Sequence, residues 1–376
     1  MNSDEYCLST LLKHDIINYY EKRVHRNYYG ILRIDGVILK RLQRRFLAKI
    51  GAFYDFGIMR EAFWMDSFWV ALNAVMPFLL YIAFGYGIQH TKLVDEAFLN
   101  RLNTMVFKCF FPILMFYNVY KTKAGFQLDS KLVIYALVSL LIVVVLLVLI
   151  VPRLVKENPV RGVVIQAIYR SNFVLFGVAL TVSVYGEDQA SLAAILVSIV
   201  IPAYNVIAVI VLEMFRGRKP NPKQLIKNII TNPLILGALC GLAFYLLGIH
   251  LPDSLEKTVA QFSDLTTPIA LFTLGGTLHF SDMARNAKVL TLGLLTKLIL
   301  LPAVILGIAA AIGFRGPELF ELLVMYGAPV ATASYAMAQN MGGDGKLAGQ
   351  FVVISTVASV LTIFFWIFSL RNMQLI

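Results

Sequence analysis

Ten long apolar stretches follow one another along this chain from about Phe68 to its end. They cover approximately residues 68–88, 97–120, 131–151, 161–185, 189–213, 229–248, 256–278, 287–312, 318–340 and 347–370. Each stretch is long enough for a helix to cross a hydrocarbon core of about 30 Å at 1.5 Å per residue. The pattern predicts an all-α polytopic membrane protein with ten transmembrane helices.

The two halves of this pattern repeat. Two pairs of prolines in corresponding stretches share a spacing of 156 residues, namely Pro77 with Pro233 and Pro112 with Pro268. Five helices in each half is an odd number, so the second copy has to enter the membrane in the opposite direction. We therefore expect two inverted five-helix repeats, over residues 65–215 and 229–376, joined by a basic loop at 216–228.

Polar residues interrupt two of the stretches. Arg170, Ser171 and Asn172 stand in a row inside one of them, with Gly177 soon after, where the backbone could unwind. Residues 176–180 (FGVAL) align with residues 326–330 (YGAPV) of the second half at an offset of 150. Interrupted helices in corresponding halves indicate the binding site of a transporter. The alternative is an ordinary spanning helix whose polar residues hydrogen-bond to its neighbours.

Composition supports a membrane protein and excludes several other classes. Of the 376 residues, 59% are hydrophobic and only 15% are charged. The three cysteines and five histidines are scattered, which predicts neither a disulfide framework nor a metal site. The chain has no nucleophile elbow, glycine-rich phosphate loop or histidine cluster. We therefore expect neither an enzyme nor a cofactor.

The positive charges indicate how the chain is oriented. The net charge of +11 comes mostly from residues 1–64 and from loops after the odd-numbered helices, above all 216–228. The positive-inside rule explains the loop charges without nucleic acid and places these loops in the cytoplasm. We expect a multi-pass plasma-membrane protein with both termini of the ten-helix core outside. Residues 1–64 lack a spanning stretch and precede Met65, so we expect a disordered or non-native basic extension there.

Several motifs resemble the auxin efflux carrier family of membrane transporters, which includes PIN-type carriers and bacterial malate and malonate permeases. Residues 172–180 (NFVLFGVAL) match the family pattern N-x-x-x-x-G-I-P-L, with Ala179 in place of the crossover proline. Further matches are Thr231-Asn232-Pro233, Ser263-Asp264, residues 271–275 (LFTLG) and Gly327-Ala328-Pro329. The resemblance covers about 310 residues. It implies that the fourth and ninth helices (161–185 and 318–340) are broken and cross, with substrate bound beside the crossing.

At such a crossing, the free amides and positive ends of half-helices attract a carboxylate. Asn172 can both donate and accept hydrogen bonds, and Arg170 offers a bidentate fork. The candidate substrate-binding residues are Arg170, Ser171, Asn172, Gly177, Gly327 and Pro329. Asp264 and Lys297 are candidates for coupling to a proton or a sodium ion. Packing, helix capping and snorkelling to lipid phosphate remain as alternative roles for these polar residues.

We interpret the chain as a secondary active transporter that carries a small organic anion, such as a mono- or dicarboxylate, by alternating access. One alternative is a sodium-coupled carrier of the bile-acid-symporter or sodium/proton-antiporter type. The other is a membrane receptor that binds a carboxylate without moving it. The expected partners are the anion, the lipid bilayer and a coupling ion, and the sequence leaves a homodimer open.

Overall fold

The computed structural model describes residues 75–121, 130–186, 189–216, 222–278 and 281–376, together with Trp69 and Leu72. The expected extension at residues 1–64 lies outside these residues. Within them the protein is helical, and the β-structure that they contain is one isolated antiparallel bridge between Ser171 and Val330. The described part of the chain is therefore all-α, as predicted.

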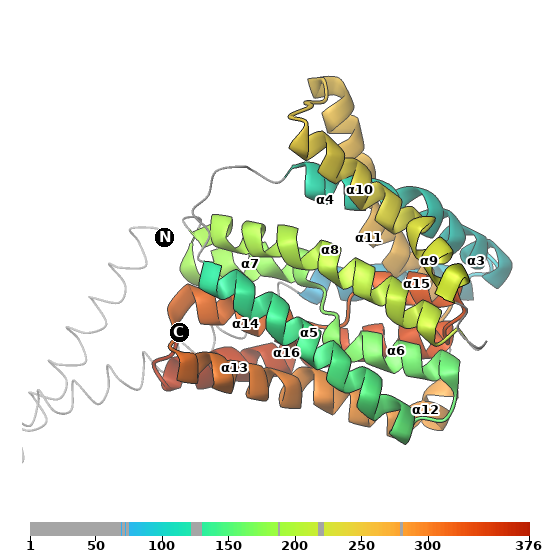
Figure 1. The fold of residues 1–376 in the computed structure, drawn as a ribbon. Coiled ribbons are helices and arrows are strands. Elements are labelled where there is room, and N and C mark those ends of the chain that lie inside the picture. The colour runs from blue at the N-terminus through green and yellow to red at the C-terminus, as the bar shows by residue number, and fades with distance from the viewer. Residues whose placement is uncertain are drawn as a thin grey trace, which may run out of the picture. The chain divides into compact units, whose positions relative to one another are not determined.

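Every predicted apolar stretch is largely helical where the structure describes it, with breaks inside 161–185, 229–248 and 318–340 (Figure 1). The helices are residues 75–90, α3 (Glu96–Met105), η1 (Val106–Phe110), α4 (Phe111–Tyr120), α5 (Ser130–Leu154), α6 (Asn158–Tyr169), α7 (Phe173–Tyr185), α8 (Ala190–Met214), α9 (Pro222–Ile230), α10 (Pro233–Leu246), α11 (Asp253–Gly276), α12 (Ser281–Leu295), η3 (Thr296–Leu300), α13 (Leu301–Ile312), α14 (Gly316–Gly327), α15 (Ala333–Met341) and α16 (Gly345–Asn372).

Five continuous helical segments of the described residues are long and apolar enough to cross a membrane by themselves. They are Glu96–Tyr120, Ser130–Leu154, Leu192–Met214, Arg285–Ile312 and Gly345–Asn372. The described residues thus support a multi-pass membrane protein. Residues 216–228, which we expected to form a loop, include most of α9 and are therefore partly helical.

Two of the long segments contain a π-helical turn directly before a proline. η1 precedes Pro112 and η3 precedes Pro302. Proline has no N–H to donate to the carbonyl four residues earlier, so the hydrogen-bond ladder has to change register there. The turn η3 carries Lys297, whose side chain is buried.

The helices pack in two groups. In the first, α10 lies along α4, while α11 contacts α3, η1 and α4 (Figure 1). In the second, α6 and α7 pack on α8, α14 packs on α7 and α13, and α15 packs on α16. We call these the α4–α10–α11 group and the α5–α8/α12–α16 group.

Glycines bring the helices of the α4–α10–α11 group into backbone contact. A Cβ atom added at Gly241 of α10 would lie 2.4 Å from the carbonyl oxygen of Phe116 in α4. One added at Gly85, in the helix of residues 75–90, would lie 2.0 Å from the carbonyl oxygen of Phe272 in α11. Small residues allow such close approach, which drives helix association in membranes where the hydrophobic effect does not.

Candidate functional site

Two helices are interrupted, and their interruptions lie against each other. α6 ends at Tyr169 and α7 begins at Phe173, while α14 ends at Gly327 and α15 begins at Ala333. The intervening segments pair in antiparallel fashion, because Asn172 N donates to Pro329 O at 2.7 Å and Ala331 N donates to Arg170 O at 3.2 Å. We call residues 170–172 and 328–332 the crossing.

Two helix N-termini meet at the crossing. Asn172 is the N-cap residue of α7 and Thr332 is that of α15, and neither side chain caps its own helix. Instead, Asn172 Nδ2 lies 3.4 Å from Thr332 Oγ1 and donates to it. The first amides of each helix have no partner within that helix and carry the positive end of its dipole. Two such ends directed at one place favour an anion.

Lys297 lies at the opposite, carbonyl end of α14. Its side chain is fully buried, and Nζ donates to Tyr326 O at 3.0 Å and to Ser171 Oγ. A cation near the last carbonyls of a helix stabilises the negative end of its dipole. Because Nζ also donates to Ser171, Lys297 links residues 170–172 to the C-terminal end of α14.

Arg170 is also buried at the crossing. Its guanidinium donates to Asn205 Oδ1 of α8, and Nη1 lies 2.8 Å from Met337 Sδ of α15. A thioether is a weak acceptor, and a guanidinium has five N–H donors. The described residues give neither Arg170 nor Lys297 a salt-bridge partner. Among the described residues, the crossing therefore holds two buried basic side chains and no carboxylate.

Two other buried polar atoms beside the crossing have no hydrogen-bond partner among the described residues. Gln166 Nε2 of α6 contacts the same Met337 Sδ as Arg170, at 3.8 Å, while Gln166 Oε1 has no hydrogen-bond partner among the described residues. Ser334 Oγ, in the first turn of α15, has none there either. Buried polar atoms usually find partners. Such atoms next to two helix N-termini suit a polar ligand.

Of the other predicted site residues, Ser171, Gly327 and Pro329 lie at or next to the crossing, whereas Asp264 does not. Gly327 ends α14, and Pro329 accepts the hydrogen bond from Asn172 within the crossing. Ser171 accepts from Lys297 and is buried. Asp264 is exposed on α11 and takes no part in the hydrogen bonds of the crossing.

The unwinding that we expected at Gly177 does not occur, while its candidate role in substrate binding stays a prediction. Gly177 lies inside the continuous helix α7, and the chain leaves the helical conformation earlier, at residues 170–172. An added Cβ there would lie 3.0 Å from Val197 Cγ2 of α8, so this glycine serves close packing between helices. The alignment of Gly177 with Gly327 fails as well, because Gly327 ends a first half-helix. Ala179 is likewise inside α7, so the family's proline position does not mark the break.

Three residues that sequence reasoning did not select belong to the neighbourhood of the crossing. Thr332 faces Asn172, Asn205 accepts from Arg170, and Tyr335 follows within the first turn of α15. The polar run Thr332-Ala333-Ser334 was a signal for the second break. Nothing in the sequence links Asn205 to a residue 35 positions earlier.

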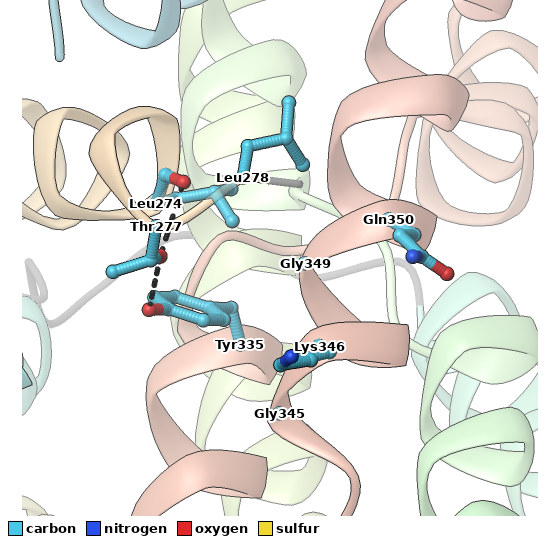
Figure 2. A pocket seen from close by; sticks show the side chains of 8 residues that line it. All are labelled: Leu274, Thr277, Leu278, Tyr335, Gly345, Lys346, Gly349 and Gln350. Atoms are coloured by element: carbon cyan, nitrogen blue, oxygen red, sulfur yellow. Dashed lines mark hydrogen bonds between the residues drawn. The ribbon is translucent and has the colours of Figure 1, made fainter. Parts of the chain in front are cut away.

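A pocket begins one helical turn from the crossing (Figure 2). It is lined by residues of α11, of the two positions that follow α11, and of α15 and α16, namely Leu274, Thr277, Leu278, Tyr335, Gly345, Lys346, Gly349 and Gln350. Thr277 and Tyr335 point their hydroxyls at each other, 2.7 Å apart. The cavity volume is about 10 Å³, far below the roughly 300–1,000 Å³ of a usual small-molecule site. As arranged here, the pocket has room for about one water molecule.

The fold and the crossing define the class of protein: an all-α, multi-pass membrane protein with two interrupted helices that meet, as in membrane transporters. A family model described as "Membrane transport protein" matches residues 70–367. The chain therefore belongs to this family, the auxin efflux carrier family that its motifs resemble.

Relatives among curated proteins agree. The chain is 24% identical over 314 residues to a "Putative malonate transporter" of Rhizobium meliloti, a match that covers 79% of this chain and 95% of the relative. It is 22% identical over 315 residues to an "Uncharacterized transporter" of Methanocaldococcus jannaschii, covering 81% of this chain and 100% of the relative. The family and these names indicate a transporter rather than an enzyme.

Proposed function

We propose that the protein is a secondary active transporter of a small organic anion, a mono- or dicarboxylate that binds at the crossing. The observation that carries the proposal is the charge of this site. Two helix N-termini and the buried guanidinium of Arg170 meet there, and the described residues supply no carboxylate to them. A buried charge without a counter-charge is unfavourable, so an anionic ligand would complete the site.

Within this proposal the residues at the crossing have different roles. Asn172 and Thr332 hold the carboxylate beside the N-termini of α7 and α15, and Arg170 supplies a fork of donors to it. Lys297 acts as a positioning residue, since its hydrogen bonds go to Tyr326 O and Ser171 Oγ. Ser171, Gly327 and Pro329 shape the backbone of the site rather than contact the substrate.

Alternating access requires two bodies that move against each other. The α4–α10–α11 group and the α5–α8/α12–α16 group are the natural pair, because each packs mainly within itself. The hydrogen bond between Thr277 of α11 and Tyr335 of α15 joins them beside the pocket (Figure 2). Breaking this contact would open a path from the pocket to the crossing.

The inverted repeat is part of the proposal, and the packing of glycines supports it. Gly85 contacts Phe272, and Gly241 contacts Phe116 in the same manner. Gly241 follows Gly85 by 156 residues, and Phe272 follows Phe116 by the same number. The two contacts are therefore equivalent under the spacing that relates the prolines. Thr266 Oγ1 also donates to Phe110 O at 3.3 Å, which pairs two positions with this separation.

The name of the Rhizobium relative makes malonate the first substrate to test. Purified protein in proteoliposomes should take up labelled malonate, malate, pyruvate or indole-acetate, with the same acid giving a thermal shift. Binding without uptake would instead favour the receptor hypothesis. Uptake that requires a sodium gradient would favour the sodium-coupled carrier. A cytoplasmic position of the basic loops, a plasma-membrane location and a homodimer belong to the proposal as further expectations.

A further inference from the structure

Glu321 is an acidic side chain in the interior of α14, about two turns before the crossing. It is fully buried, with Phe320 and Leu322 as its neighbours in the chain. A carboxylate buried among apolar groups is unfavourable unless a cation or several donors compensate it. The surroundings of Glu321 therefore decide which protonation state it adopts.

The contacts of Glu321 favour the neutral acid. Its Oε1 contacts Thr181 Oγ1 of α7, whereas Oε2 is buried without a hydrogen-bond partner among the described residues. Thr181 Oγ1 also lies 2.8 Å from Gly177 O, an acceptor in its own helix. A hydroxyl has one hydrogen. If Thr181 donates it to the Gly177 carbonyl, the hydrogen between Thr181 and Glu321 has to come from the carboxyl group.

Among the described residues, no charged group compensates a negative charge on Glu321. Besides Glu321, α14 itself carries the titratable residues Glu318 and Tyr326, and α13 carries none. The titratable residues of the other helices packed against α14 are Tyr185 on α7, Tyr204 and Glu213 on α8, Lys297 on η3, Lys346 and Arg371 on α16, and Lys131, Tyr135 and Arg153 on α5. Lys297 donates to Ser171 and Tyr326, and Tyr204 donates to Met325 O. The described residues form no salt bridge to Glu321.

We propose that Glu321 and Thr181 form a proton-binding site that couples transport to a proton. In the arrangement seen here, α7 and α14 pack against each other and Glu321 holds the proton, because an ionised carboxylate would be buried unpaired. When water reaches Oε2, the carboxyl group transfers its proton to water and the packed arrangement becomes unfavourable. The proposal rests on the proposed transport function and names its coupling ion.

The test uses proteoliposomes that contain malonate and an entrapped pH indicator. The wild type should accumulate malonate when a pH gradient is applied, with protons moving in the same direction. Glu321→Gln keeps the shape of the neutral acid and an N–H donor but cannot ionise. It should retain exchange of labelled for unlabelled malonate and lose accumulation above equilibrium, together with proton movement. Glu318→Gln, one turn earlier in α14, is the matched control and should behave like the wild type.

Three outcomes would decide the question. Accumulation and proton movement at wild-type level in Glu321→Gln would overturn the proton site, as would wild-type malonate transport without proton movement. Absence of both exchange and uptake in the wild type would contradict the transport function instead. The proton site then remains testable by infrared spectroscopy, because the C=O stretch of a neutral carboxylic acid at neutral pH should disappear in Glu321→Gln. An unchanged band would overturn the site.

A second variant guards against misfolding. Thr181→Val removes the hydroxyl that contacts Glu321 while it preserves volume, whereas Thr181→Ser keeps the hydroxyl. Thr181→Val should shift the pH dependence of malonate accumulation, and Thr181→Ser should leave it unchanged. Identical pH profiles of both variants and the wild type would contradict a role for this contact.

Discussion

Arg170 and Lys297 are both buried basic residues, yet their side chains differ in what they can still bind. Nζ of Lys297 donates to two protein oxygens, one of them the carbonyl of Tyr326 near the end of α14. Arg170 donates to one oxygen, that of Asn205, and otherwise contacts sulfur. Because a guanidinium carries five N–H donors, Arg170 retains donors for a ligand. We therefore assign substrate contact to Arg170 and positioning to Lys297.

This assignment predicts the effect of Lys297→Met. Methionine preserves much of the volume but leaves Tyr326 O and Ser171 Oγ without their donor, which should lower the stability of the protein by about 1–3 kcal/mol. Thermal unfolding in detergent measures this loss, and malonate affinity in the folded fraction should change little. Lys131→Met, at an exposed residue of α5, is the control. A stable Lys297→Met protein that has lost affinity would place Lys297 among the ligand contacts.

The polar run Arg170-Ser171-Asn172 was recognisable because such residues are rare in spanning helices, and the structure places all three at a helix break. Glu321 obeys the same rule, but it stands near the start of its apolar stretch and was not selected. Thr332 could not be paired with Asn172, since the repeat spacing changes between the prolines and the crossing. Short insertions of this kind are invisible without the fold.

At the scale of elements, backbone contacts between helices determine how the α4–α10–α11 group assembles. The closest approach joins the helix of residues 75–90 to α11, where Gly85 meets the carbonyl of Phe272. A methyl group cannot be placed there unless the helices separate.

Gly85→Ala should therefore destabilise the protein by about 1–3 kcal/mol, as overpacking does. Gly87→Ala in the same helix is a matched control, because a Cβ there has no neighbour within 4 Å. It should be neutral or stabilising, since alanine favours a helix by about 1 kcal/mol over glycine. If the repeat is real, Gly241→Ala should resemble Gly85→Ala. Thermal unfolding of the three variants compares them, and equal stability of Gly85→Ala and Gly87→Ala would contradict the contact.

The positions of the breaks show where sequence reasoning stopped. Both interrupted helices were expected, because glycine, proline and polar residues gather in them. The exact point of unwinding was not, since Gly177 looked like the flexible residue. In the structure the partly buried Val197 lies against Gly177, so this glycine is explained by helix packing. A glycine in a membrane helix has both uses, and the sequence alone does not distinguish them.

At the scale of the whole core, the loops separate into two ends. Asp344 N donates to Pro159 O at 3.3 Å, and a Cβ on Gly342 would lie 3.0 Å from Arg216 Cγ, so loops after α5, α8 and α15 lie together. Gly316 N donates to Leu375 O at 2.8 Å, which brings the loop before α14 to the C-terminus. From the charge asymmetry we propose that the first end is cytoplasmic.

Cysteine labelling tests this orientation. A cysteine in place of Arg216 should react with a membrane-impermeant maleimide only after cells are permeabilised, and one in place of Asn372 should react from outside. The background is the chain with Cys7, Cys109 and Cys240 replaced by serine. Labelling with the sides reversed would show that the positive loops face outward.

The ten apolar stretches and the all-α class were predictable from hydropathy, because each helix has to satisfy its backbone within an apolar medium. The grouping of helices was not, since it depends on contacts such as Gly241 with Phe116 that are remote in sequence. The crossing was predictable only in part. Its polar residues are recognisable from the local sequence, but their partners Asn205 and Thr332 are identified only by the tertiary structure.

The most direct test of the crossing as the substrate site is counterflow. Proteoliposomes loaded with unlabelled malonate are diluted into labelled malonate, and entry of label is followed for the wild type, Asn172→Ala and Asn340→Ala. Asn340 belongs to α15 but hydrogen-bonds to Ala336 O of its own helix, so its variant is the control. Losing the Asn172 contact should weaken malonate binding by about 1–3 kcal/mol, raising the concentration for half-maximal exchange roughly fivefold to 150-fold, while Asn340→Ala exchanges like the wild type. Wild-type exchange by a folded Asn172→Ala protein would contradict a substrate site at the crossing.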